Sequence, residues 1–447
     1  MLIAKKFEQI LKALLPAPFT IAVLLTFFTF ILALIITEPK ADQNHFIQLL
    51  SFWEQGIWHS PLLVFAIQMM LMLVLGHTLA LSKPIKNLIS KGVQHCTNTA
   101  NAAAIITFST ILVSLFNWGL GLIFGAIFAR KVGEHASAKN IKLNYPLIGA
   151  AGYSGLMVWH GGISGSAPIK IAEEGHFLAE KIGVISQAET VFSTMNMSIS
   201  IVLLFVLPLL MYCLGKLNSG SNITLSSEIK EKDAATNGAE KLDHSTILAY
   251  LFGGTIILYA FYKAIILPEN ISLTVINPNY INLVLLGLTI VMHKSFFNFL
   301  KAVDNAISGA SGILIQFPLY FGIMGIMNHS GMVEIMSGFF VSISNETTFP
   351  IFTFISAGIV NVFVPSGGGQ WAVQGPIIIE AATKLGVSIP KSVMALAYGD
   401  QLTNMLQPFW ALPLLGITAL KAKEILPYTL ILLIAGTVIF IGGLLIF

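Results

Sequence analysis

The sequence predicts an all-α polytopic membrane protein with two inverted-topology repeats, each containing a re-entrant helical hairpin and a broken transmembrane helix. Three observations support this fold class: the composition, two uncharged stretches interrupted by glycine and polar residues, and a likeness between the halves of the chain. Of the 447 residues, 55% are hydrophobic and only 10% are charged, and the mean hydropathy is +0.81. Soluble domains carry roughly 25% charged residues, so this composition is typical of a chain that lies in lipid.

Apolar stretches recur along the chain as candidate membrane spans, because a helix needs about 20 apolar residues to cross a bilayer. They are 17–37, 61–82, 145–169, 190–213, 246–267, 279–293, 309–328, 392–418 and 426–447. The N-terminal segment MLIAKKFEQILKALLPAPFT has no small-residue cleavage site after a short apolar core. We therefore expect it to be retained as an amphipathic lead-in to the first span.

Two further uncharged stretches, 103–129 and 351–379, are predicted to form re-entrant hairpins at about 103–131 and about 351–380. Pro365 and the consecutive glycines 367–369 divide the second stretch into arms of about 14 and 9 residues. At 1.5 Å per residue, neither arm crosses about 30 Å of hydrocarbon. The first stretch is interrupted less sharply, at FNWGLGLIFG.

The basic residues indicate the orientation of the chain. If the N-terminus is cytoplasmic, the loops on that side hold 18 of the 24 lysines and arginines, as the positive-inside rule requires. Lys384 and Lys391 fall on the opposite side. The polar segment 216–245 is predicted to be a cytoplasmic linker. The sequence thus predicts a multi-pass protein with a cytoplasmic N-terminus.

The two halves of the chain, 1–215 and 246–447, resemble each other. GYSGLMVWHGGISGSAPI aligns with AYGDQLTNMLQPFWALPL at an offset of 245 residues, and Tyr153 then pairs with Tyr398. In each half, the predicted hairpin precedes this stretch. We interpret the halves as two repeats joined by the linker.

The aligned stretches are predicted to be broken helices, at about 145–170 and about 392–418. We expect 279–293 to be one extra span in the second half, which places the repeats in opposite orientations. Inverted repeats whose broken helices meet at the bilayer midplane are typical of secondary transporters.

The tip of the second hairpin, VPSGGGQWAVQGP, is a candidate substrate site. Irregular backbone at membrane depth persists only where protein or a water-filled cavity surrounds it. Glycine lets backbone approach a ligand, and free N–H groups at a helix start accept an anion. The alternative is that the glycines only allow close helix packing. The candidate substrate-binding residues here are Ser366, Gly367, Gly368, Gly369 and Gln370.

The second broken helix contains a candidate site for a coupling ion. Asp400 is the only acidic residue between Ser392 and Leu420, and an acid within a span is a functional hypothesis because its charge costs at least about 2.5 kcal/mol there. Oxygen-bearing side chains follow at helical spacing: Thr403, Asn404 and Gln407. Such oxygens suit Na⁺, whereas a protonatable Asp would equally serve H⁺. The alternative is a carboxylate that only caps or joins helices.

The first half offers a matching set of polar positions in WHGGISGSAP and at the first hairpin tip. Hydroxyls and glycines in a broken helix suit a carboxylate or a cation. The candidate substrate-binding residues here are Asn117, Gly119, Gly161, Gly162, Ser164 and Ser166. His160 could titrate, but a single histidine in a membrane is more often a packed, hydrogen-bonded one, so its role stays open.

The residue types that are missing from the predicted midplane limit the class of ligand that the sequence favours. Arg130 is the sole arginine and lies outside the midplane, so no bidentate clamp for a dicarboxylate or phosphate is available there. A small monoanion held by amides and hydroxyls, together with one cation, fits better. Cys96 and Cys213 suggest neither a disulfide framework nor a metal site, and we expect no catalytic residues, no cofactor and no nucleic-acid partner.

The same motifs resemble the bacterial short-chain fatty acid transporter family over essentially the whole chain. They are FNWGLGLIFGAIFAR, GGISGSAP, ILIQFPLYFGIM, VPSGGGQWAVQGP and AYGDQLTNMLQPFWALP. The resemblance implies import of a short-chain monocarboxylate, such as acetoacetate or butyrate, across the inner membrane. It also implies a homodimer in which a hairpin-bearing domain moves as an elevator, driven by Na⁺ or H⁺.

Three other functions remain open at this point. One is a carrier for another small organic anion, such as a C4-dicarboxylate or a substituted amino acid. Another is an intramembrane hydrolase with a serine nucleophile, although the sequence contains no G-x-S-x-G motif and no metal-spaced histidine pair. The third is a channel, against which the inverted repeat argues because that plan is typical of alternating access.

Overall fold

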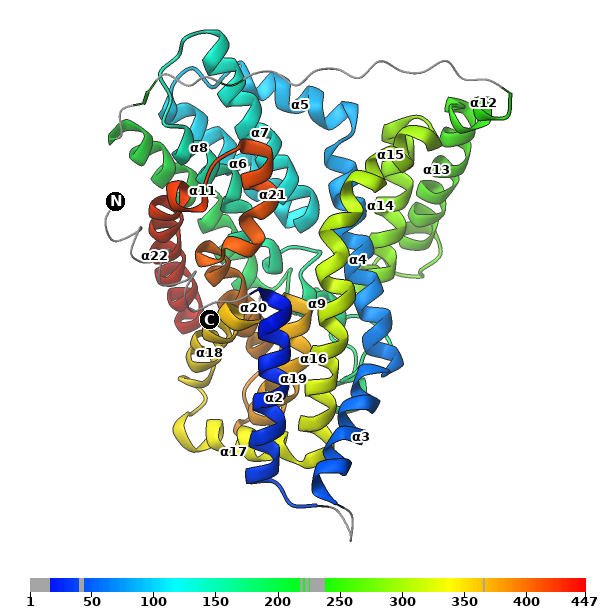
Figure 1. Cartoon of the computed structure of the whole chain (residues 1–447), viewed down its shortest axis with the longest axis vertical. Coiled ribbons are helices and arrows are strands. Elements are labelled where there is room, and N and C mark those ends of the chain that lie inside the picture. The colour runs from blue at the N-terminus through cyan, green and yellow to red at the C-terminus, as the bar shows by residue number, and fades with distance from the viewer. Residues whose placement is uncertain (1–16, 40–43, 218–219, 222–224, 226–237, 365) are drawn as a thin grey trace.

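The computed structural model describes residues 17–39, 44–217, 220–221, 225, 238–364 and 366–447 (Figure 1). In this part of the chain the regular structure is helical, apart from one isolated bridge between Leu143 and Ser221. Seven of the described helical segments are long and apolar enough to cross a membrane. The predicted all-α membrane fold is therefore confirmed. The predicted N-terminal lead-in and Pro365 lie outside the described residues.

The first repeat begins with a spanning helix and continues through a hairpin and a broken helix. Its helices are α2 (Pro18–Ile36), α3 (His45–Ile57), α4 (Ser60–Ala80), α5 (Lys83–Val93), α6 (Thr99–Phe116), α7 (Trp118–Ala138), α8 (Tyr145–Tyr153), η1 (Ser154–Met157), η2 (Trp159–Gly161), α9 (Ser166–Ile171), α10 (Ala179–Ile182) and α11 (Thr194–Leu217). The linker that we expect at 216–245 lies largely outside the described residues.

The second repeat has the same order of elements. Its helices are α14 (Pro278–His293), α15 (Phe296–Ile307), η5 (Ser308–Ala310), α16 (Ser311–Ser330), α17 (Met332–Ile343), α18 (Phe349–Phe363), α19 (Gly367–Leu385), α20 (Ile389–Thr403), η6 (Asn404–Leu406), α21 (Pro408–Thr418) and α22 (Ala422–Ile446). Between the repeats lie α12 (Glu240–Asp243), α13 (Thr246–Phe261), the π-helix η3 (Tyr262–Ile266) and η4 (Leu273–Val275).

The packing identifies α13 as the additional helix of the second half. α2 packs on α16, and α14 packs on α4, so each opening helix contacts the long central helix of the other repeat. α13 packs mainly on α14 and has no counterpart among the described helices of the first repeat. The expectation that 279–293 is the extra span therefore assigns the wrong helix, because that segment corresponds to α2.

The two repeats run in opposite directions through the molecule (Figure 1). α4 leads from α3 at one end of the molecule to α5 at the other, whereas α16 leads from α15, at the α5 end, to α17, at the α3 end. The hairpin of α6 and α7 enters from the α5 end, and that of α18 and α19 enters from the α3 end. Both tips and both helix breaks therefore meet in the middle of the molecule.

Four short amphipathic helices flank the two central helices and were not predicted. α3 and α5 flank α4, and α15 and α17 flank α16. Each has 11 to 13 residues and buries only part of its surface. Such helices lie across the ends of membrane spans rather than through the bilayer.

Candidate functional site

Asn117 forms the tip of the first hairpin. It ends α6 and caps α7, because its Oδ1 accepts a hydrogen bond from the N–H of Leu120 at 2.8 Å. The next amide, that of Trp118, donates to Ser164 Oγ at 3.1 Å, which ties this tip to the first helix break. Gly119 packs against α4, since a Cβ at this position would lie 2.9 Å from the carbonyl oxygen of Leu73. A hydrogen bond to the first helix break and close packing on α4 therefore hold this tip in place.

The first helix break, between α8 and α9, surrounds His160. The N–H of Ser166 donates to His160 Nδ1 at 3.2 Å, so Nδ1 acts as an acceptor and the neutral ring carries its proton on Nε2. The N–H groups of His160 and Gly161 point at Gln401 Oε1, at 2.8 and 3.4 Å. Gly162 leaves no room for a side chain, because a Cβ there would lie 2.3 Å from the Leu115 carbonyl oxygen.

Ser366 forms the tip of the second hairpin and caps α19. Its Oγ accepts from the N–H of Gly369 at 3.2 Å, and its carbonyl accepts from the N–H of Gln370 at 2.7 Å. Among the described residues, no hydrogen-bond acceptor is found for the N–H groups of Gly367 and Gly368. Two backbone donors are therefore open at the start of a 19-residue helix, where the helix dipole favours a negative charge.

Glycine is required along this tip for close packing as well. A Cβ at Gly367 would lie 2.4 Å from His160 Nε2 and 3.2 Å from Ser166 Oγ. A Cβ at Gly369 would lie 2.4 Å from the ring of Tyr320, and Gly368 faces the rings of Phe65 and Phe317. The tip is buried in protein between the first helix break and α16. Of its three glycines, Gly367 is the one that faces the polar side chains of His160 and Ser166.

The second helix break, between α20 and α21, is held by Asn361 near the end of α18. Asn361 Nδ2 donates to the carbonyl of Asp400 at 2.7 Å, to Thr403 Oγ1 at 2.9 Å and to Asn404 Oδ1 at 3.0 Å. Gln407 Nε2 donates back to the carbonyl of Asn361. The side chains of Asp400, Thr403, Asn404 and Gln407 are thereby gathered around one turn.

The two helix breaks meet at His160 and Asp400. His160 Nε2 and Asp400 Oδ1 lie 3.3 Å apart, and both side chains are 1% exposed. The pair does not reach hydrogen-bond geometry, and neither carboxylate oxygen of Asp400 has a donor. A buried carboxylate without donors is costly unless a cation or proton joins it.

Further buried polar atoms around this pair have no partner in the described structure. The unpartnered oxygens are Asn361 Oδ1, Gln370 Oε1 and Gln407 Oε1, and the unpartnered donors are Asn117 Nδ2 and Asn404 Nδ2. Natural proteins leave few such atoms, and each requires an explanation. We refer to the region bounded by Asn117, His160–Ser166, Asn361, Ser366–Gln370 and Asp400–Gln407 as the crossover site.

The model of a family described as "Short chain fatty acid transporter" matches residues 2–447. The chain belongs to this short-chain fatty acid transporter family.

Two curated relatives in the family are similar to this chain over nearly their whole length. One, from Escherichia coli K12, is 36% identical over 100% of this chain and 99% of its own. The other, from Haemophilus influenzae, is 37% identical over 96% of this chain and 96% of its own. The name of each assigns it provisionally to short-chain fatty acid transport.

Two solved transporter structures share the fold of this family member. The YdaH transporter of Alcanivorax borkumensis, described as having an unusual topology, superposes with a TM-score of 0.60 at 13% identity, covering 96% of this chain and 98% of its own. MtrF of Neisseria gonorrhoeae, from a class described as antimetabolite efflux pumps, superposes with a TM-score of 0.56 at 13% identity, covering 98% and 97%. These similarities show the fold alone.

The crossover site also contains residues that the sequence analysis did not single out. Asn361 is the sole amide side chain of α18, whose other polar side chains are Thr353 and Ser356, and this amide was the signal that could have revealed it. Gln401 adjoins Asp400, but its side chain faces the first helix break and not the residues that are candidates for ion binding. Asn196 of α11 donates to the carbonyl of Gly161 at 2.8 Å and accepts from the Tyr398 hydroxyl at 3.0 Å.

A buried lysine next to the crossover site was also missed. Lys170, at the end of α9, is 2% exposed and lies 2.5 Å from Glu173 Oε2. Its Nζ contacts Gln68 Oε1 at 3.3 Å and lies 5.2 Å from the centre of the Phe65 ring. Asn279 of α14 donates to Glu173 at 3.0 Å. This network connects the first broken helix to α4 and α14.

Proposed function

We propose that this chain is a secondary active importer of short-chain monocarboxylates such as acetoacetate and butyrate. In this proposal the crossover site binds one carboxylate and one monovalent cation together. The observation that carries it is the proximity of two open amides at the second hairpin tip, His160 Nε2 and an unneutralised Asp400. Family membership supports the substrate class.

The donors of the crossover site suit a small carboxylate. The N–H groups of Gly367 and Gly368 lie at a helix start, and the Gly367 backbone adjoins His160 Nε2 and Ser166 Oγ. Amide, imidazole and hydroxyl donors converging on one point bind a single negative charge well. The site has no arginine, because Arg130 pairs with Glu134 at 3.0 Å on α7. A second carboxylate on the substrate would find no arginine here, and the neighbouring Lys170 is already paired with Glu173.

The acceptors of the crossover site suit Na⁺ as the coupling ion. Asp400 contributes both carboxylate oxygens, and Asn361 and Gln407 contribute neutral oxygens that lack donors. Hard cations are bound by several oxygens of this kind, whereas a proton needs only one. The proposal therefore places Na⁺ at Asp400, with H⁺ as the alternative that the experiment below distinguishes.

The proposed movement is of elevator type. In this proposal the two hairpins and two broken helices move together past α4 and α16. Gly368 and Gly369 present no side chain to the rings of Phe65, Phe317 and Tyr320, which supports a surface on which the tip can slide. Dimeric assembly, location in the inner membrane and a cytoplasmic N-terminus stay predictions of the sequence.

The decisive experiment is uptake of radiolabelled butyrate into proteoliposomes that contain the full-length protein. An inward Na⁺ gradient and an inward pH gradient are imposed in turn. We expect concentrative uptake with the Na⁺ gradient, competition by unlabelled acetoacetate, and little competition by succinate.

Each other outcome changes a specific part of the proposal. Uptake driven by the pH gradient alone would assign the cation site to H⁺. Stronger competition by succinate than by acetoacetate would overturn the monocarboxylate assignment. Flux that shows neither saturation nor counterflow would favour a channel over a carrier.

A further inference from the structure

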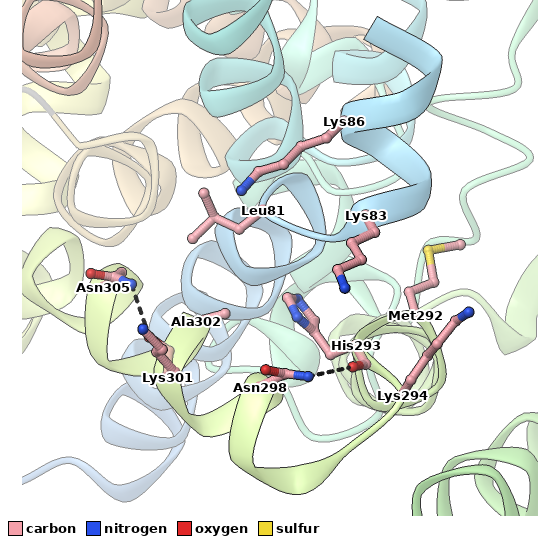
Figure 2. Close-up of a pocket in the computed structure, with 10 residues that line it drawn as sticks. All are labelled: Leu81, Lys83, Lys86, Met292, His293, Lys294, Asn298, Lys301, Ala302 and Asn305. Carbon is pink, nitrogen blue, oxygen red and sulfur yellow. Dashed lines mark hydrogen bonds between the residues drawn. The ribbon is translucent and has the colours of Figure 1, made fainter. Parts of the chain in front are cut away.

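A basic pocket lies at the α5 end of the molecule, away from the crossover site (Figure 2). It has a volume of about 290 Å³ and lies where α4 leads into α5 and α14 leads into α15. Its residues come from these two junctions: Leu81, Lys83, Lys86, Met292, His293, Lys294, Asn298, Lys301, Ala302 and Asn305. Four of the ten are lysines, and none is a carboxylate.

Three of the four lysines of this pocket have no acid beside them in the described structure. No carboxylate of the described residues lies within ion-pair distance of Lys83, Lys86 or Lys294. Figure 2 shows the ammonium group of Lys83 directed toward His293, and that of Lys86 on the same side of the pocket as Leu81. Lysines brought together without an acid repel one another, so an anion between them is favoured.

The frame of the pocket is held in place by contacts between the two junctions. The ring of His293 bonds through Nε2 to the carbonyl oxygen of Thr78 at 2.8 Å, joining the end of α14 to α4. Ser82 Oγ contacts Met292 Sδ at 3.9 Å. Asn298 Nδ2 donates to the His293 carbonyl at 3.4 Å, which fixes the start of α15. The lysines therefore extend from a defined surface and not from a loose loop.

The helices α5 and α15, which contribute to the pocket, also carry exposed apolar side chains. On α15, Phe297 is 43% exposed and Leu300 is 55% exposed, and on α5 Leu88 is 56% exposed. Both helices are amphipathic and lie beside the ends of membrane-spanning helices. A ligand that is anionic at one end and apolar at the other would match this arrangement.

We propose that the basic pocket binds the phosphate headgroup of an anionic phospholipid, with its acyl chains against the exposed apolar residues of α5 and α15. Basic pockets between membrane helices bind such headgroups, and each nearby lysine adds to the affinity. A soluble phosphate shares the headgroup chemistry, but it would leave the apolar surroundings uncovered. The proposal depends on the membrane spans and not on the substrate or coupling ion.

The test is a titration of the detergent-solubilised full-length protein, followed by native mass spectrometry to count bound molecules. Three probes are used: phosphatidylglycerol, phosphatidylcholine and inorganic phosphate. We expect saturable binding of phosphatidylglycerol, and the double variant Lys83→Gln/Lys86→Gln should lower its affinity roughly thirtyfold. A matched pair outside the pocket, Lys142→Gln/Lys423→Gln, should change the affinity less than about twofold.

The outcomes separate the possible occupants. Equal binding of the two phospholipids, or equal losses in the two double variants, overturns the proposal. Displacement of phosphatidylglycerol by inorganic phosphate at similar concentrations reassigns the pocket to a soluble anion and also overturns it. If Lys83→Gln/Lys86→Gln is not monodisperse, Lys294→Gln alone serves as the test, and wild-type affinity in that variant overturns the proposal.

Discussion

At the first hairpin tip, side chains bind two of the first three backbone amides of the returning helix, whereas at the second tip the first two amides are open. Trp118 donates to Ser164, and Leu120 donates to Asn117. α19 begins with Gly367 and Gly368, which have no acceptor in the described structure. The same hairpin architecture therefore serves as a structural clamp in one repeat and as a candidate anion site in the other.

The two helix breaks differ in the same complementary way. At the offset of 245 residues, Asp400 corresponds to Gly155, whereas Ser164 corresponds to Phe409 and Ser166 to Ala411. At the helix breaks, the first repeat thus contributes imidazole and hydroxyl donors, and the second contributes the carboxylate acceptor. Inverted repeats supply the same frame twice, but a site between them needs each kind of polar group only once. Five substitutions can break or sharpen this comparison.

Asp400→Asn should have the largest effect. The substitution removes the charged ligand of the proposed cation site, so coupled uptake should fall by at least roughly a hundredfold. Gradient-driven butyrate uptake in proteoliposomes measures it. Asp243→Asn, in the short helix α12, is the matched control and should transport normally. Full Na⁺-dependent uptake by Asp400→Asn would remove this residue from coupling.

Gly367→Ala should have the next largest effect and tests the difference between the tips. The new Cβ would lie 2.3 Å from His160 Cε1, so the ring must move away from Asp400. We expect the KM for butyrate to rise roughly tenfold, corresponding to one lost charge-assisted hydrogen bond. Gly254→Ala, where nothing lies within 4 Å, should leave the KM unchanged.

Gly119→Ala provides the same test at the first tip. Its Cβ would meet the Leu73 carbonyl at 2.9 Å, so the change should lower the midpoint of thermal unfolding with little change in KM. A rise in KM as large as that of Gly367→Ala would show that both tips contact substrate, and the comparison would fail.

Much of the fold was predictable because uncharged stretches of spanning length stand out clearly in this chain. The interruptions at Asn117 and Ser366 were predictable for the same reason, since polar residues and glycine are conspicuous there. The amphipathic helices were missed, because α3, α5, α15 and α17 mix polar and apolar residues over only 11 to 13 positions. Length and hydropathy alone do not distinguish such segments from loops.

The assembly of the site could not be predicted to the same depth. His160 and Asp400 lie far apart in the sequence, and their contact depends on how two broken helices cross. Asn361 holds the second break through three hydrogen bonds, but a single amide in an apolar arm carries little signal. Lys170 follows directly after a predicted span, where a lysine is commonly read as a helix end at the membrane surface.

His160→Asn should have a moderate effect and separates the two nitrogens of the ring. An asparagine oxygen can accept from the Ser166 amide as Nδ1 does, but no donor remains at the position of Nε2. We expect the KM for butyrate to rise about fivefold to tenfold, because a hydrogen bond to a charged group is lost. Unchanged kinetics would assign His160 to packing alone.

Asn117→Ser should have the smallest effect. A serine hydroxyl can still accept from the Leu120 amide, since serine caps helices about as well as asparagine, so stability should change by less than about 0.5 kcal/mol. The substitution also removes Nδ2, which is buried at the first tip without a partner. If the first tip is only a clamp, that donor has no ligand to lose, and butyrate uptake should stay within roughly twofold of wild type. A larger rise in KM with unchanged thermal stability would mean that Nδ2 reaches the substrate. In that case donors from both tips contact the substrate, and the two tips differ less in function than their hydrogen bonds indicate.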